Sequence, residues 1–233
     1  MKKFLTIAAF MLFAVSSAQA ERMKIGATLK AGLFQVDDAQ EIFSGAHSSG
    51  ASPGKVTKKA SSEGDDDTEG EFGYGSIFIE LSANDRFAIG IDHVPQSLET
   101  ETTENKQNMG TPVTGEDATS TNTVQVDFEN LTTIYALLYA TENIYLKAGL
   151  MEVDVSTNET LATGGAYGNT SLDGYTIGLG YDHELDNGAF VRFETAYMDI
   201  DGATLKNTND SNKSVTADGI TGASVAVSIG KSF

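Results

Sequence analysis

The sequence predicts an all-β fold, a closed antiparallel barrel of eight membrane-spanning strands, and three observations carry this prediction. Apolar residues alternate with small or polar residues in eight segments, as in strands that face lipid on one side and a narrow lumen on the other. Short and long gaps between these segments alternate along the chain. The last segment, 219–233, alternates strictly, places Val225, Val227 and Ile229 on one face, and ends in Phe233.

The first 20 residues have the three parts of an export signal peptide. Met1-Lys2-Lys3 is a short basic region, an apolar run extends from Phe4 to Val15, and Ala18-Gln19-Ala20 provides the small residues of a cleavage site. The apolar run is too short for a membrane-spanning helix. We therefore assign 1–20 to a signal peptide and 21–233 to the barrel, with an amphipathic N-terminal helix as the alternative.

The strands are expected, in chain order, at 22–37, 71–82, 86–95, 123–140, 144–156, 172–184, 189–200 and 219–233. Three gaps between them are tight turns, and one of these contains the hairpin pair Asn187-Gly188. The other four gaps are long and polar and predict external loops at 38–70, 96–122, 157–171 and 201–218. An extra hairpin in one of the two longest gaps would give ten strands. A soluble barrel or sandwich is a further alternative, but such folds do not demand short and long loops at opposite ends.

Strand parity separates a lipid-facing side from a lumen-facing side. The pattern predicts that the lipid-facing side carries the large apolar residues, among them Ile25, Leu29, Leu33, Ile77, Ile79, Ile177, Leu179 and Phe193. Two strands fit this parity poorly, because His93 falls on the lipid-facing side and Glu152 and Asp154 continue the lipid-facing side of Leu150. Either the membrane ends near Leu150 or a β-bulge shifts the phase, and the sequence leaves both open.

Charged residues collect on the predicted lumen side, near the tight turns. Four of them are basic and four are acidic, and together they predict a lumenal ion-pair network of Lys24, Glu80, Arg86, Lys147, Asp182, Glu184, Arg192 and Glu194. A buried ion without a partner costs several kcal/mol, so a balanced set is what a dry lumen requires. An eight-stranded barrel is just narrow enough for side chains to fill it. The sequence therefore predicts a plugged lumen.

Composition excludes several classes of function. The chain has 15 Lys and Arg against 33 Asp and Glu, a net charge of −18, which disfavours nucleic acid as a partner. It has no Cys, so thiolate catalysis and Cys-based metal sites are excluded. The acidic run Asp65-Asp66-Asp67 lacks EF-hand spacing, and divalent cations at such acidic loops are a possible partner. His183 lies between Asp182 and Glu184, but parity points it outward, and we expect neither enzyme activity nor a cofactor.

The signal peptide, the alternating strands, the loop asymmetry and the terminal Phe233 cover the whole chain. With these features the chain resembles small bacterial outer-membrane β-barrel proteins of the OmpA transmembrane domain, OmpX, OmpW and opacity-protein type. Lys231 departs from their pattern, because an apolar residue is usual there. The resemblance implies a monomer in the bacterial outer membrane, with both termini periplasmic and the long acidic loops extracellular.

The same resemblance implies partners and a role. It implies contact with outer-membrane lipid and lipopolysaccharide, and an assembly signal at Phe233 for the barrel-assembly machinery. The implied role is structural or one of surface interaction, and the alternative is a narrow channel or lateral portal for small molecules, as in the OmpW-like branch.

Overall fold

The computed structural model describes residues 22–37, 40–43, 55–59, 68–100, 102–108, 119–161 and 164–233. The predicted signal peptide, 1–20, lies outside these residues. Within them, no helix is long and apolar enough to span a membrane.

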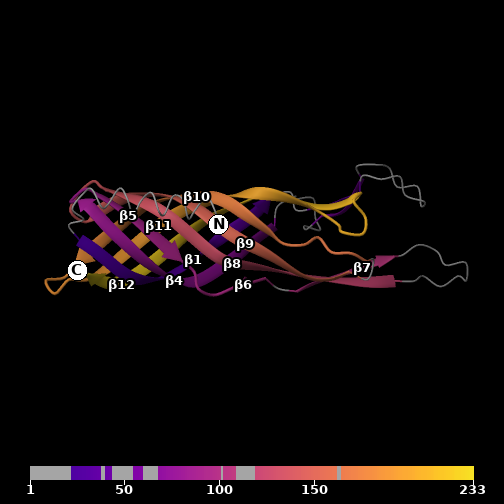
Figure 1. Cartoon of the computed structure of the whole chain (residues 1–233), viewed down its shortest axis with the longest axis horizontal. Coiled ribbons are helices and arrows are strands. Elements are labelled where there is room, and N and C mark those ends of the chain that lie inside the picture. The colour runs from indigo at the N-terminus through magenta and orange to yellow at the C-terminus, as the bar shows by residue number, and fades with distance from the viewer. Residues whose placement is uncertain are drawn as a thin grey trace, which may run out of the picture.

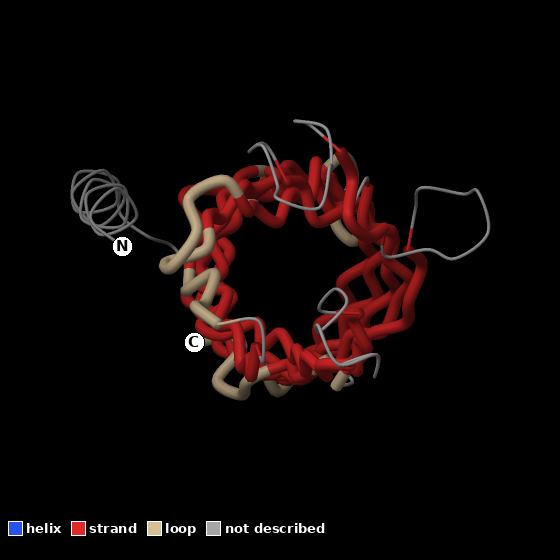
Figure 2. The backbone as a smooth tube through the Cα atoms, turned by 90° about the vertical axis from the view of Figure 1, so that its right-hand side faces the viewer, coloured by secondary structure: helices blue, strands red, loops and turns tan. Residues whose placement is uncertain are grey.

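Eight strands form a closed antiparallel barrel (Figures 1 and 2), as the sequence predicts. In order around the barrel they are β1 (Arg22–Asp37), β4 (Thr68–Asn84), β5 (Phe87–His93), β8 (Thr119–Tyr139), β9 (Ile144–Leu161), β10 (Thr170–Glu184), β11 (Ala189–Lys206) and β12 (Lys213–Ser232). The pairing of β1 with β12 closes the ring. At the end of the barrel where β12 finishes, the backbones of Met23 and Phe233 exchange two hydrogen bonds of 3.2 and 2.8 Å. We call this the short-turn end and the opposite end the loop end.

Four further strands lie in the two longest connections. They are β2 (Gln40–Phe43), β3 (Lys55–Lys59), β6 (Leu98–Glu99) and β7 (Thr103–Asn108). β2 pairs with β12 and with β3, whereas β6 and β7 both pair with β8. None of them is inserted between two barrel strands, so the barrel has eight strands and not ten.

Several strands run further toward the loop end than the sequence predicts. β8 begins at residue 119, β9 continues to 161, and β11 and β12 pair as far as Lys206 and Ser214. The expected loop 201–218 is therefore mostly a hairpin, and 157–171 is partly strand. The predicted bounds followed the apolar alternation, which ends where lipid ends. A backbone ladder needs no apolar side chains and continues beyond that point.

The register of the ladders fixes the width of the lumen. Following paired residues once around the barrel leads from Ile25 through Ile79, Ile91, Ile134, Leu150, Tyr175, Asp199 and Thr221 to Gln35, ten residues further along β1. Such a stagger goes with strands tilted by about 35–45°. The interior of an eight-stranded barrel is then just wide enough for side chains.

The two faces follow the predicted parity. Outward side chains are apolar and highly exposed, for example Leu29 at 74%, Val225 at 65% and Ile229 at 62%. Inward neighbours such as Phe78 and Ser228 are buried. We call the outward apolar residues the apolar belt, whose members include Ile25, Leu29, Leu33, Ile77, Ile79, Ile91, Leu146, Leu150, Ile177, Leu179, Phe193, Val225, Val227 and Ile229.

The structure decides the open question on β9. Its register with β10 is unbroken, so Glu152 and Asp154 keep the outward parity of Leu150 and the apolar belt ends there. A bulge does occur, but it lies on β8 between Glu129 and Thr132. His93, on the outer wall nearby, shares a hydrogen bond of 3.0 Å with the hydroxyl of Thr132.

Candidate functional site

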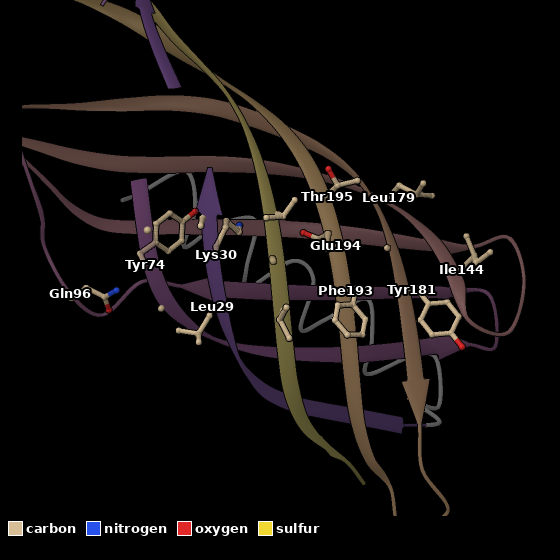
Figure 3. A pocket seen from close by; sticks show the side chains of 17 residues that line it. Leu29, Lys30, Tyr74, Gln96, Ile144, Leu179, Tyr181, Phe193, Glu194 and Thr195 are labelled. Carbon is tan, nitrogen blue, oxygen red and sulfur yellow. The ribbon is translucent and has the colours of Figure 1, made fainter. Parts of the chain in front are cut away.

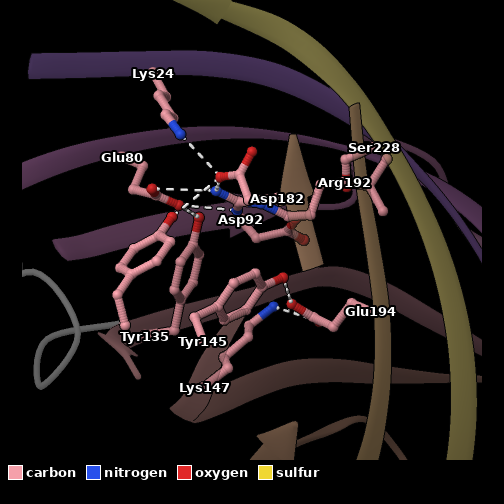
Figure 4. Close-up of polar contacts among 12 residues, drawn as sticks. Lys24, Glu80, Asp92, Tyr135, Tyr145, Lys147, Asp182, Arg192, Glu194 and Ser228 are labelled. Atoms are coloured by element: carbon pink, nitrogen blue, oxygen red, sulfur yellow. Dashed lines mark hydrogen bonds and ion pairs between the residues drawn. The ribbon is translucent and has the colours of Figure 1, made fainter. Parts of the chain in front are cut away.

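The centre of the lumen is an arginine that bridges two carboxylates from different strands (Figure 4). Arg192 on β11 donates to both carboxylate oxygens of Glu80 on β4, at 2.9 and 3.2 Å, and to Asp182 on β10 at 2.8 Å. All three side chains are buried, Arg192 being only 4% exposed. Because β4 and β10 are not neighbours in the barrel, this contact spans the lumen.

A lysine from a third strand extends the arrangement toward the short-turn end. Lys24 on β1 donates to Asp182 at 2.8 Å and lies 3.5 Å from Glu184. Asp182 is 3% exposed as a side chain, whereas Glu184 is 31% exposed. Glu184 therefore marks the hydrated rim of the ion-pair network.

A second pair lies on the neighbouring wall. Lys147 on β9 donates to Glu194 on β11 at 2.9 Å, and the Tyr145 hydroxyl donates to the other carboxylate oxygen at 2.8 Å. The ammonium of Lys147 also lies over the ring of Tyr135, 4.5 Å from its centroid. Tyr135 in turn donates to Glu80 at 3.2 Å, which links the two groups of charges.

Aromatic rings enclose the guanidinium of Arg192. The rings of Tyr145, Phe78 and Phe190 have their centroids 5.1, 5.3 and 5.6 Å from its central carbon. Some of these rings lie directly over lumen-facing glycines, since a Cβ on Gly180 would collide with Tyr145. The small residues of the lumen face thus make room for rings that exclude water from the charges.

Seven of the eight predicted network residues lie in this arrangement, and Arg86 does not. Arg86 is exposed in the tight turn between β4 and β5, where its backbone N–H donates to the Asn84 side chain at 2.9 Å. The prediction began this strand at residue 86, but β5 begins at Phe87, so Arg86 belongs to the turn and its side chain does not follow the strand parity.

The predicted ion-pair network left out two lumenal charges, although parity already placed Lys30 on the lumen side. Lys30 lies inside the barrel with its ammonium 5.4 Å from the ring centroid of Tyr74. Asp92 is buried and accepts a hydrogen bond of 2.9 Å from Ser76. The parity of each strand carried the signal for both, because Asp92 alternates with the outward Ile91 just as Lys30 alternates with Leu29.

Toward the loop end the lumen changes from charged to apolar. A cluster of buried side chains fills it there, contributed by several strands and by the segment after β5. We call it the upper apolar cluster, and its buried members are Tyr74, Val94, Leu131, Met151, Val153 and Ile200. Phe72, Leu98, Phe128, Leu172, Met198 and Ile220 pack against them.

The barrel wall is incomplete beside this cluster. β5 ends at His93, which pairs with Ile77 of β4, and the chain beyond it pairs with β8 rather than with β4. In the part of the chain that the structure describes, β4 residues 68–76 pair with β1 on one side and have no ladder partner on the other. We call this stretch the free edge of β4.

A groove with a volume of about 1110 Å³ crosses the outer wall and ends near the free edge (Figure 3). It runs from Ile144 on β9 to Gln96, which follows β5, and its large side chains on the outer face are apolar, among them Leu29, Leu179, Phe193, Val225 and Val227 of the apolar belt. Lys30, Tyr74 and Glu194 also line the groove, each between two outward-facing neighbours, and their side chains point into the lumen. The groove is therefore an apolar surface on the lipid side of the wall.

The residues considered for catalysis and metal binding lie on the outer wall or outside the described residues. His183 is exposed on the outer wall and stacks on Tyr181, while the carboxylate of the adjacent Asp182 points into the lumen. Among the described residues, no group of three or more His, Cys, Asp or Glu side chains could hold a metal ion. The acidic run Asp65-Asp66-Asp67 lies outside the described residues.

Comparisons with known proteins give similarity in structure only. No family model matches the chain, and no curated protein matches it. OprG from Pseudomonas aeruginosa, an outer membrane protein, is 13% identical, with a TM-score of 0.42 over 89% of this chain and 95% of that one. The outer membrane protease OmpT from Escherichia coli is 11% identical, with a TM-score of 0.38 over 92% of this chain and 97% of that one. The attachment invasion locus protein Ail of Yersinia pestis, in complex with the heparin analogue sucrose octasulfate, is 8% identical, with a TM-score of 0.36 over 90% of this chain and 99% of that one.

Proposed function

We propose that this chain is a bacterial outer-membrane barrel with a closed lumen and a structural or surface-interaction role. A closed ladder with an apolar outer belt supports the membrane location, because only helices and closed barrels satisfy their backbone groups in lipid. The barrel leaves no unpaired edge at the short-turn end, where β1 meets β12.

The bridge formed by Arg192 is the observation that carries the closed lumen. It joins Glu80 and Asp182 across the barrel, and the rings around it leave these charges almost no exposed surface. An ion crossing the membrane through the lumen would have to break these pairs and leave buried charges without partners, at several kcal/mol each. The geometry therefore supports a plug rather than a pore.

Orientation and partners complete the proposal. Both termini are periplasmic and the loop end is extracellular, presenting an acidic surface beyond the apolar belt. Phe233, at the end of the closing strand, is the signal for the barrel-assembly machinery. The protein is a monomer, and its apolar belt contacts lipid and lipopolysaccharide. Heat-dependent gel mobility of outer-membrane fractions tests the location, and recovery of a soluble periplasmic protein would contradict it.

Conductance in planar bilayers tests the plug. The purified protein should show no stable single-channel steps. Arg192→Ala should also leave the bilayer silent, because the upper apolar cluster still fills the lumen near the loop end, and so should Lys206→Ala, at an exposed site on the loop-end extension of β11. Steady steps in the unmodified protein would replace this proposal with an open channel.

A non-catalytic role is part of the same proposal. His183 and the carboxylate of Asp182 lie on opposite faces of β10, so they do not form a base and nucleophile pair. His183→Ala should leave the lipid A and phospholipid composition of expressing cells unchanged. A lipid product that disappears in this variant would establish an enzyme.

The free edge of β4 favours a second candidate, a lateral portal for small molecules. It lies beside the upper apolar cluster, and the outer groove ends next to it. A portal in the wall is compatible with a plugged lumen, because the route avoids Arg192. Faster uptake of decane by expressing cells, without ion conductance, would favour the portal, and equal uptake with and without the protein would exclude it.

A further inference from the structure

The free edge of β4 lies at the depth of the apolar belt. Gly73 pairs with Ala31 of β1, and Gly75 pairs with Leu29, which is 74% exposed in the belt. Open sheet edges do not persist in lipid, because each backbone N–H and C=O group needs a hydrogen-bond partner there. Within the described residues, this stretch of the wall therefore lacks a neighbouring strand.

The chain that follows β5 does not supply that strand. Ile77 of β4 and Thr132 of β8 both pair with the last residue of β5. Four residues further toward the loop end, these two strands reach Gly73 and Phe128. Phe128 pairs with Leu98 of β6, so Leu98 lies level with Gly73, but no ladder among the described strands joins β6 to β4. The facing edges of β4 and β6 are therefore level with each other and unpaired.

The inner side of the free edge is apolar and aromatic. The rings of Phe72 and Tyr74 stack with their centroids 5.6 Å apart, and both residues belong to or pack against the upper apolar cluster, as does Leu98. The outer side is bare, because a Cβ on Gly73 would meet its nearest atom, apart from its chain neighbours, at 3.8 Å. A strand laid along this edge therefore needs apolar side chains at its inner positions, and its outer positions face lipid.

The loop end of the free edge is acidic. Glu69 and Glu71 are exposed on β4, and Glu99 is exposed on β6. Glu71 pairs with Leu33 of the apolar belt, so these carboxylates lie where the belt meets the polar region. Neither of the two edges carries Lys or Arg among its described residues. Charge complementarity therefore favours basic side chains on a partner, at the end where it leaves the membrane.

We propose that the free edge of β4 binds an extended segment of another polypeptide, which adds a strand antiparallel to β4. The segment is apolar at the depth of the belt and basic where it emerges at the loop end. Main-chain hydrogen bonds supply the affinity, and the apolar and basic side chains supply the specificity. This inference rests on the surface-interaction role proposed above and gives that role a partner. It does not involve the ion pairs of Arg192, so the plug stands or falls separately.

Fluorescence anisotropy of a synthetic nine-residue peptide tests this inference, with the protein in phosphatidylcholine nanodiscs and empty nanodiscs as background. The peptide has an acetylated N-terminus, alternates valine and threonine over six residues, ends in three lysines and carries a dye at its C-terminus. Its binding should be saturable, and a peptide with glutamates in place of the lysines should bind at least tenfold more weakly. Methylation of the backbone nitrogens in one alternate set of its residues should abolish binding, and methylation of the other set should be tolerated, because only one set faces β4.

Variants of the protein locate the site. Glu69→Lys combined with Glu71→Lys should weaken binding of the lysine peptide at least tenfold, whereas Asp201→Lys, a matched charge reversal at an exposed position on β11, should bind like the unmodified protein. The heat-dependent gel shift verifies that each variant is folded. The chain has no Cys, so a peptide with cysteine in place of its first lysine should form a disulfide, with diamide as the oxidant, with Glu71→Cys and not with Asp201→Cys.

Each other outcome overturns the inference. Equal weakening by Asp201→Lys would mean that the overall negative charge holds the peptide, and tolerance of both methylated peptides would mean that no strand is added. Disulfide-linked dimers of Glu71→Cys without peptide would assign the edge to a second copy of this chain. Absence of saturable binding by folded protein would remove the strand site, while heat-dependent mobility and bilayer conductance would still decide the membrane location and the plug.

Discussion

Removing Arg192 is the sharpest test of a dry lumen. In Arg192→Ala, Asp182 keeps Lys24 at 2.8 Å. Among the described residues, Glu80 loses the one cation within 4.0 Å of it and keeps the hydroxyl of Tyr135. Glu80 is 1% exposed, so its charge is left buried and nearly uncompensated. Breaking a buried pair in this way costs about 3–5 kcal/mol of the free energy of unfolding.

Urea unfolding in lipid vesicles, followed by the heat-dependent gel shift, measures this loss. A second variant separates charge from packing, because Glu80→Gln combined with Arg192→Met removes the orphaned charge while filling part of the space. It should be more stable than expected from the two single changes, with a coupling energy of ~0.5–3 kcal/mol. Lys206→Ala, at an exposed site, should change stability by less than about 0.5 kcal/mol.

A small effect would refute the reasoning. If Arg192→Ala cost less than about 1 kcal/mol, the pair would behave like an exposed surface ion pair. Water would then have to reach Glu80 despite the rings of Phe78, Tyr145 and Phe190 around the guanidinium. The plug proposal would fall with that result, and the channel would replace it.

Two further predictions concern the outer wall. Val227→Arg places a charge in the apolar belt and should cost about 2–4 kcal/mol in the free energy of folding into lipid vesicles. Asp201→Arg, at an outward position beyond the belt, should fold with nearly unchanged yield. Equal losses in the two variants would mean that the belt is misplaced. Hydrogen bonds from Ser171 and Asn130 lower the pKa of Asp154, outside the belt, from its ordinary value of 3.8. Its stabilising contribution is therefore present above that value and is lost as the pH falls through the lowered pKa, so Asp154→Asn should reduce the loss of stability in acid-unfolding curves below about pH 4.

Alternation of apolar and polar residues predicted the barrel because the two faces of each strand have different surroundings. Lipid outside and packed side chains inside require opposite chemistry at successive residues, and Val227 and Ser228 show this directly, since one is 45% and the other 4% exposed. The same rule fails beyond the belt, where the outer face no longer meets lipid. The extended hairpin of β11 and β12 and the bulge at Asn130, whose φ is 55°, were therefore not predictable from alternation.

For the candidate site, the sequence predicted which charged residues lie in the lumen but not how they pair. Parity located most of the lumenal charges, but it could not choose their partners, because partners on non-adjacent strands depend on the stagger of the barrel. Arg192 and Glu80 are 112 residues apart in the chain and meet only across the closed ring. Arg86 was placed wrongly because β5 begins one residue later, at Phe87, and an alternating pattern does not fix the end of a strand to one residue.

The two halves of the lumen limit the routes that any solute could take. Near the short-turn end, ion pairs and rings fill the interior, and near the loop end the upper apolar cluster fills it. A polar solute would have to displace both, whereas an apolar one would have to displace only side chains of its own kind, and the free edge of β4 lies beside those side chains. The proposed plug would therefore exclude ions more strongly than aliphatic molecules.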